Sequence, residues 1–254
     1  MINVQNFYSR LTPLYHLIYP DWEKSIKHQG EIIDSVIQEI FGGGARDVLD
    51  VSCGIGTQAL GLATIGYNVT ASDLSVEEVD RAKQEAHDRN LTIDFSVADM
   101  RKAFNHHKQQ FDIVISCDNS IPHLLTDEDI LNAIKQFYKC TRPSGNCIIT
   151  VRDYERENLS HQQIKPYGIR EKNNIRWLLW QVWDPHPPMY DVTFYFVEDH
   201  GKSTCKTHAL RATYYAIGIP KIIAMMKQAG FDNVHRLDDR YFQPMIIGIK
   251  KSYK

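Results

Sequence analysis

The sequence predicts an α/β fold, built on a doubly wound, mostly parallel seven-stranded sheet with an antiparallel insertion after its fifth strand. Strand-like and helix-like segments alternate between residues 47 and 152, which is typical of a parallel sheet covered on both faces. Strand-like runs alone follow up to residue 218, and a helix with two further strands ends the chain.

The first element is a helix predicted over residues 22–41, where Ile26, Ile33, Ile37 and Ile40 recur close to helical spacing. We expect residues 1–41 to form an N-terminal helical arm.

The cofactor-binding core is expected at residues 42–152. Its predicted strands cover 47–52, 67–73, 91–99, 111–117 and 144–152. Helices are expected at 57–65, at 76–89 with Ser75 as N-cap, and at 127–140.

The aromatic and β-branched runs NIRWLLWQVWD, MYDVTFYFVED and CKTHALRATYYAI predict an antiparallel, substrate-side insertion at about 153–218. Residues 219–254 then complete the core with a helix stopped by Gly230 and a closing strand pair. The whole chain is expected to be one domain.

Composition narrows the function. The chain has 254 residues, 43% hydrophobic and 24% charged, with net charge −2, so a nucleic-acid partner is not expected. Five cysteines without C-x-x-C spacing suggest neither a disulfide framework nor a metal site. No secretory leader and no apolar stretch long enough to span a membrane is recognised, so we expect a cytoplasmic protein without a membrane partner. A homo-oligomer is compatible with the sequence.

The stretch VLDVSCGIGTQALGLA carries Gly54 and Gly56 at a predicted strand-to-helix turn. Such a loop lets the backbone approach a ligand, and the helix that follows offers free N–H groups. NAD and S-adenosylmethionine both fit this spacing. Asp73 ends the second strand, 23 residues after Asp50, and could bind the ribose of either cofactor.

Asp99 ends the third predicted strand. Its carboxylate could accept a hydrogen bond from the adenine amine of S-adenosylmethionine, or it could cap the following helix. The sequence leaves both interpretations open.

The motifs VLDVSCGIG, VTASDLS, VADM, SCDNSIPHLL and RPSGNCIITVRDY together resemble class I S-adenosylmethionine-dependent methyltransferases, most of all the glycine and sarcosine N-methyltransferase branch. The resemblance covers most of the chain and implies a Rossmann-like methyltransferase fold with S-adenosylmethionine as cofactor. It also implies cofactor contacts for Tyr8, Tyr19, Trp22, Asp50, Ser52, Cys53, Gly54, Gly56, Asp73, Leu74, Asp99, Met100, Cys117 and Asp118.

Three residues are the catalytic candidates. Asn119 follows the fourth strand at the ligand-binding edge and could orient the acceptor or simply form a turn. His123 could act as base or donor, or be structural. Arg152 could clamp a substrate carboxylate, as the resemblance implies, or pair with Asp153 or Glu155.

Tyrosines could supply hydroxyls or rings around an amine; the candidates are Tyr154, Tyr195, Tyr214 and Tyr215, of which the last two cannot both face inward.

The leading hypothesis is methyl transfer to a small-molecule acceptor, an amine that carries a carboxylate. A base-methylating enzyme is disfavoured, since DNSIP stands where such enzymes carry a di-proline motif. The alternatives are an NAD-dependent oxidoreductase, disfavoured by the lack of a Tyr-x-x-x-Lys motif, and a non-catalytic S-adenosylmethionine-binding protein.

Overall fold

The computed structural model describes residues 4–41 and 43–252, and it confirms the predicted fold class. A seven-stranded sheet has the order β10-β11-β5-β4-β1-β2-β3, with only β11 and β10 antiparallel to their neighbours. Its strands are β1 (Asp47–Asp50), β2 (Asn68–Asp73), β3 (Asp94–Val97), β4 (Phe111–Ser116), β5 (Thr141–Thr150), β10 (Asp232–Leu237) and β11 (Met245–Ile249).

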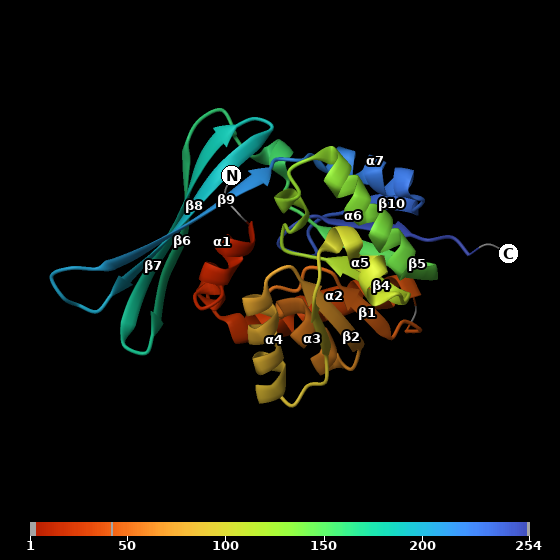
Figure 1. Ribbon diagram of the computed structural model, residues 1–254, viewed down its shortest axis with the longest axis horizontal. Helices are drawn as coiled ribbons and strands as arrows, with labels where there is room; N and C mark the ends of the chain where they lie inside the picture. The colour runs from red at the N-terminus through yellow and green to blue at the C-terminus, as the bar shows by residue number, and fades with distance from the viewer. Residues whose placement is uncertain (1–3, 42, 253–254) are drawn as a thin grey trace.

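Helices cover both faces of this sheet (Figure 1). One face carries α2 (Trp22–Phe41), α3 (Thr57–Ile65) and α4 (Val76–Asp88), and the other carries α5 (Ala103–His107), α6 (Asp127–Cys140) and α7 (Ile219–Ala229). Side chains of neighbouring β1 residues point to opposite faces of the sheet. Val48 packs on the face that α2 covers, and Leu49 packs on the face that α6 covers.

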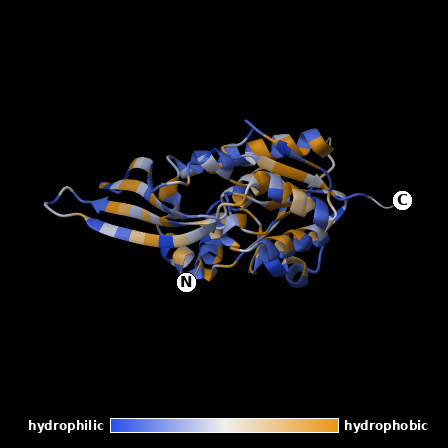
Figure 2. Cartoon of the chain, turned by 90° about the horizontal axis from the view of Figure 1, so that it is seen from above, coloured by the Kyte–Doolittle hydropathy of each residue, from blue (hydrophilic) through white to orange (hydrophobic). Residues whose placement is uncertain are grey.

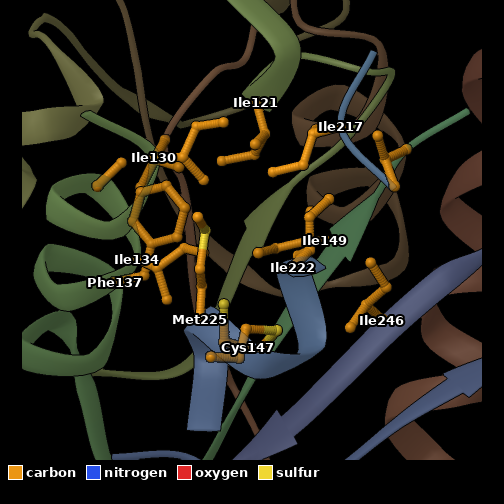
Figure 3. Close-up of a cluster of buried hydrophobic side chains, with 14 of the residues drawn as sticks. Ile121, Ile130, Ile134, Phe137, Cys147, Ile149, Ile217, Ile222, Met225 and Ile246 are labelled. Atoms are coloured by element: carbon orange, nitrogen blue, oxygen red, sulfur yellow. The ribbon is translucent and has the colours of Figure 1, made fainter. Parts of the chain in front are cut away.

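The α6–α7 side is a close-packed aliphatic layer (Figure 3). Ile130, Ile134 and Phe137 of α6 meet Ile222 of α7 over the β5 residue Ile149, and all five are fully buried. This rigid layer holds the carboxyl ends of β4 and β5 in place.

The helices α2 and α3 approach so closely that their backbones touch. A Cβ atom placed on Gly61 of α3 would lie 2.4 Å from the carbonyl oxygen of Ile26 and 3.0 Å from the Cα of Gly30, both in α2. Only glycine fits at this crossing, and it locks α2 against the helix that follows the glycine loop.

The insertion forms a second, four-stranded antiparallel sheet of β6 (Gln163–Lys172), β7 (Ile175–His186), β8 (Met189–Asp199) and β9 (Lys206–Tyr215). Orange and blue segments alternate along its strands in Figure 2, as expected where one face is buried and the other is not. The helix α1 (Val4–Leu11) lies between this sheet and α4, with Phe7 and Leu11 packed on the inner face of the sheet (Figure 1).

The predicted helices agree with the structure to within two residues, and Ser75 and Gly230 cap α4 and α7 as expected. The sequence analysis missed β6, because Pro166 and the irregular pairing at Gly168 interrupt its pattern at the sheet edge. The strand predicted over 91–99 is shorter, only β3, and β5 begins three residues earlier than predicted because Thr141 already pairs with Phe111. No helix within the described ranges is long and apolar enough to cross a membrane.

Candidate functional site

The carboxyl ends of β1, β2 and β4 meet at one edge of the large sheet, and the predicted cofactor residues gather there. Gly54 and Gly56 adopt left-handed φ angles of 52° and 94° in the loop after β1. A Cβ atom on Gly54 would lie 3.3 Å from the ring of Tyr15, which belongs to the 3-10 turn Tyr15–Ile18 that follows α1. The side chain of Tyr15 therefore lies directly against the backbone of the loop.

Asp73 stands at the end of β2, directly beside this loop. One carboxylate oxygen accepts the N–H of Gly54 at 2.9 Å, and the other accepts the N–H of Ser75 at 3.0 Å. Burial raises the pKa of the Asp73 carboxyl. The two backbone bonds orient the carboxylate that the sequence analysis assigned to a ribose.

Asp50 lies beneath the loop and is fully buried. Its Oδ1 accepts the N–H of Ser52 at 3.1 Å, while Oδ2 has no partner. Burial raises the pKa of Asp50 to about 8. The hydroxyl of Ser52 lies 3.0 Å from that of Ser116 in β4, and Cys53 is buried.

The N-terminal arm brings two predicted cofactor residues to this edge. The Tyr8 hydroxyl lies 2.6 Å from Nε2 of His123, and the Tyr19 hydroxyl donates to Asp118 at 2.8 Å. Trp22 instead donates its indole N–H to the hydroxyl of Thr57 at 2.9 Å, behind the glycine loop.

Asp118 and Asn119 follow β4 in left-handed conformations, with φ of 57° and 64°. The Asp118 carboxylate also accepts the Gln58 amide at 3.1 Å, and Gln58 donates in turn to Gln29 and Tyr241. Cys117 is buried at the end of the strand. Asp118 thus belongs to a polar network that joins β4 to α2, α3 and the loop before β11.

Asn119 positions its neighbours. Its carbonyl oxygen accepts the backbone N–H of Arg152 at 3.0 Å, and its amide donates to the Tyr154 hydroxyl at 2.8 Å. Asn119 therefore stands in a turn and holds the backbone of Arg152, and its orientation of the acceptor stays a prediction.

The Arg152 guanidinium lies over the ring of Trp183, 4.8 Å from its centroid, and pairs with Glu157 at 3.3 Å. The alternative that Arg152 pairs with Asp153 or Glu155 is not realised, because Glu157 takes that place and Asp153 pairs with Arg236 at 2.6 Å. The Nε of Arg152 is buried without a partner.

A cavity of about 730 Å³ opens in front of Arg152, between the arm and the small sheet. Its aromatic wall comprises Phe7, Tyr8, Tyr15, Tyr19, Tyr167, Trp183, Tyr190, Phe194, Tyr214 and Tyr241. Tyr214 lies in this wall, whereas Tyr215 turns away and donates to Asp127 at 2.7 Å, so only one of the pair faces inward, as predicted.

Tyr195 does not reach the cavity. It stacks on Trp180 on the opposite face of the small sheet, with ring centroids 5.4 Å apart, so its predicted place around an amine was wrong. Its register position decides this, because its neighbours Phe194 and Phe196 take the inner face.

His123 is a half-buried imidazole beside the N-terminal arm. Burial lowers its pKa to about 3, and its Nδ1 has no hydrogen-bond partner. Its close contact with Tyr8 favours the donor or structural interpretation over that of a general base near neutral pH.

The residues predicted near adenine lie further along the edge. Asp99 caps the 3-10 turn Met100–Lys102 and accepts the Arg101 guanidinium at 2.6 Å, so the capping interpretation is realised. Leu74, which was predicted to contact the ribose, is exposed. Contacts of Asp99 and Met100 with adenine, and of Leu74 with the ribose, stay predictions.

Sequence reasoning missed Gln29, Gln58 and Tyr241, which build the network around Asp118, and the cavity residue Trp183. Gln29 could have been recognised from the sequence, because this polar residue interrupts the apolar stripe of α2 between Ile26 and Ile33.

The site suits S-adenosylmethionine on two structural grounds. The left-handed glycine turn at Gly54 and the oriented carboxylate of Asp73 match a nucleoside ligand, and unpartnered buried oxygens on Asp50 and Glu78 call for one more polar group. No group of three metal-ligating side chains occurs in the part of the chain that is described.

Comparisons with known proteins agree with this geometry. Residues 48–145 match a family model described as a methyltransferase domain. A glycine/sarcosine N-methyltransferase of Parasynechococcus marenigrum (strain WH8102) is 31% identical over 136 residues, which cover 54% of this chain and 47% of that protein. The chain spans about half the length of the first curated relatives that it matches.

Two solved structures share the fold. A S-adenosylmethionine-dependent methyltransferase from Clostridium acetobutylicum ATCC 824 superposes with a TM-score of 0.76 at 15% identity, covering 98% of this chain and 100% of that one. CalS10, an amino pentose methyltransferase from Micromonospora echinaspora with bound S-adenosylmethionine, has a TM-score of 0.78 at 14% identity, covering 89% and 92%.

Proposed function

We propose that this chain, which belongs to the class I S-adenosylmethionine-dependent methyltransferases, methylates the nitrogen of a small amine that also carries a carboxylate. The observation that carries the proposal is the Arg152 guanidinium, half-buried in an aromatic cavity beside the glycine loop with an unpartnered Nε. Such a group can bind a carboxylate through two parallel hydrogen bonds.

Residues of the edge would hold the cofactor. The backbone of the glycine loop would carry the methionine end, and Asp73 would accept hydrogen bonds from the ribose hydroxyls. When bound, S-adenosylmethionine supplies a methyl group already activated by a sulfonium. The chain therefore has to position the acceptor rather than activate the donor.

The acceptor's two ends would be held by different walls of the cavity. Arg152 fixes the carboxylate, and Asn119 fixes the backbone of Arg152. The rings of Tyr190 and Tyr214, stacked with centroids 5.4 Å apart, offer an apolar wall against which an amine can be directed while water is excluded.

Proton removal would precede methyl transfer. The neutral His123, with its pKa near 3, is a poor base at neutral pH, and the acceptor amine can lose its proton to solvent before it binds. Arg152 and the aromatic wall would then hold the neutral amine toward the methyl group that bound S-adenosylmethionine would supply.

The decisive test is a panel of acceptors assayed with purified protein for release of S-adenosylhomocysteine. The panel contains glycine and its N-methyl derivatives, the matching methyl esters, larger α-amino acids and hydroxy acids. We expect turnover with amines that have a free carboxylate and little with their esters. Turnover of hydroxy acids alone would contradict nitrogen as the acceptor.

The same assay separates the alternatives. Binding of S-adenosylmethionine without turnover of any acceptor would indicate a non-catalytic binding protein. Calorimetric binding of NAD in place of S-adenosylmethionine would indicate an oxidoreductase.

A further inference from the structure

Glu78 is a buried carboxylate at the cofactor edge that the proposed function does not yet use. It lies in the first turn of α4, is 1% exposed, and its Oε1 has no hydrogen-bond partner. The other oxygen lies 3.4 Å from the position that a Cβ atom on Gly54 would occupy. Its carboxylate therefore lies against the backbone of the glycine loop, beside the ring of Tyr15.

The helix cap does not explain this orientation. In a capping box, a glutamate three residues after a serine N-cap binds the N–H of that serine. Here the N–H of Ser75 donates to Asp73 instead, at 3.0 Å, while Ser75 Oγ accepts the N–H of Glu78 at 3.4 Å. The Glu78 carboxylate is thus not used to cap the helix.

Glu78 shares the edge with the buried carboxylate of Asp50 and the half-buried carboxylates of Asp73 and Asp118. None of the four forms an ion pair with a Lys, Arg or His anywhere in residues 4–41 and 43–252. Among the described residues, the groups that interact electrostatically with Glu78 include Asp73, Glu77, Tyr8, Tyr15, Tyr19 and Cys53, and none of these is a cation. Buried carboxylates without a cation are costly, so the edge favours a positively charged ligand.

We infer that Glu78 is a specificity residue that favours the cationic S-adenosylmethionine over S-adenosylhomocysteine, whose sulfur is uncharged. This inference rests on the proposed function, because only methyl transfer interconverts the two molecules. Loss of the sulfonium charge on transfer would weaken the attraction to Glu78 and so favour release of the product.

Proton linkage makes the inference measurable in the unaltered protein. Burial, with the neighbouring Asp73 and Glu77, raises the pKa of Glu78 well above its usual value. A cation arriving beside Glu78 stabilises the ionised form, so binding should release protons. S-adenosylmethionine should therefore release more protons than S-adenosylhomocysteine.

The experiment is titration calorimetry of the full chain with each molecule, in buffers of different ionisation enthalpy. It uses the wild type, Glu78→Gln, which keeps shape and hydrogen bonding but removes the charge, and Asp80→Asn as a matched control. Asp80 is exposed on the same helix, so its variant makes the same change in net charge outside the site.

We expect Glu78→Gln to weaken the binding of S-adenosylmethionine about tenfold, or about 1.4 kcal/mol. The binding of S-adenosylhomocysteine should weaken less than about threefold. The excess proton release should shrink, and Asp80→Asn should resemble the wild type. If Glu78→Gln weakened the binding of both molecules equally, or changed neither affinity, the inference would be overturned. Equal proton release by both molecules from the wild type would overturn it even if the variant failed to fold. Failure of the wild type to bind S-adenosylmethionine would refute the proposed function instead.

Discussion

The replacement Arg152→Lys tests the central contact of the proposed acceptor site. Lysine keeps the positive charge, can still lie near Trp183 and can still pair with Glu157, but it lacks the planar fork. It removes the buried Nε donor that has no partner in the protein. We expect weaker use of the acceptor and unchanged binding of the cofactor.

The magnitude follows from the bond that is lost. A hydrogen bond to a charged group contributes about 1.5–3 kcal/mol, and about 1.4 kcal/mol corresponds to a tenfold change. The value of kcat/KM for the acceptor should therefore fall roughly 10- to 150-fold. The affinity for S-adenosylmethionine should stay within about twofold, since no contact joins Arg152 to the glycine loop.

The assay measures initial rates against acceptor concentration at saturating S-adenosylmethionine, with calorimetry for the cofactor. Arg156→Lys is the comparison, because Arg156 lies at the cavity rim with 78% of its side chain exposed. Equal losses in acceptor use and cofactor affinity would show that Arg152 is structural. A larger effect at Arg156 would place the carboxylate at the rim and refute the clamp.

Three further replacements test the fold and the site. Gly61→Ala should destabilise the protein by about 2 kcal/mol in urea unfolding, because its Cβ would lie 2.4 Å from a backbone oxygen of α2. The control Gly44→Ala should change the stability little, because the nearest atom lies 3.9 Å from its Cβ position. A stabilising Gly61→Ala would contradict the close contact between the backbones of α2 and α3. Asp73→Ala should weaken the binding of S-adenosylmethionine at least tenfold in calorimetry. An unchanged affinity would contradict a contact between Asp73 and the ribose. The folded-state pKa of His123, about 3, lies below its unfolded value of about 6.5, so unfolding takes up a proton between these pH values and stability falls as the pH drops through them. His123→Gln should flatten that decline in unfolding measurements across pH, whereas the exposed His200→Gln should not.

Local pattern was enough to predict most elements and the sheet edge at which the glycine loop and Asp73 meet. The alternation of strands and helices needs only periodicity and caps, and Gly54 with Asp73 needs only the rule that ligands bind at the carboxyl edge of a parallel sheet. The strand β6 was missed because an edge strand with a proline lacks that periodicity.

The partners of polar side chains could not be predicted. Arg152 pairs with Glu157 rather than its neighbours, and Gln29, Gln58 and Tyr241 meet although up to 212 positions separate them. No local pattern encodes such contacts, because they depend on how distant elements pack.

The sequence by itself determined the fold class, the glycine loop and the presence of a carboxylate after β2, because these depend on chemistry within a few residues. Only the tertiary structure decided that Tyr214 faces the cavity and Tyr195 does not, since the register of the small sheet sets the direction of each side chain. It also decided that Glu78 is a buried charge rather than a helix cap, because burial and the lack of a partner arise only when the arm, α4 and the loop come together.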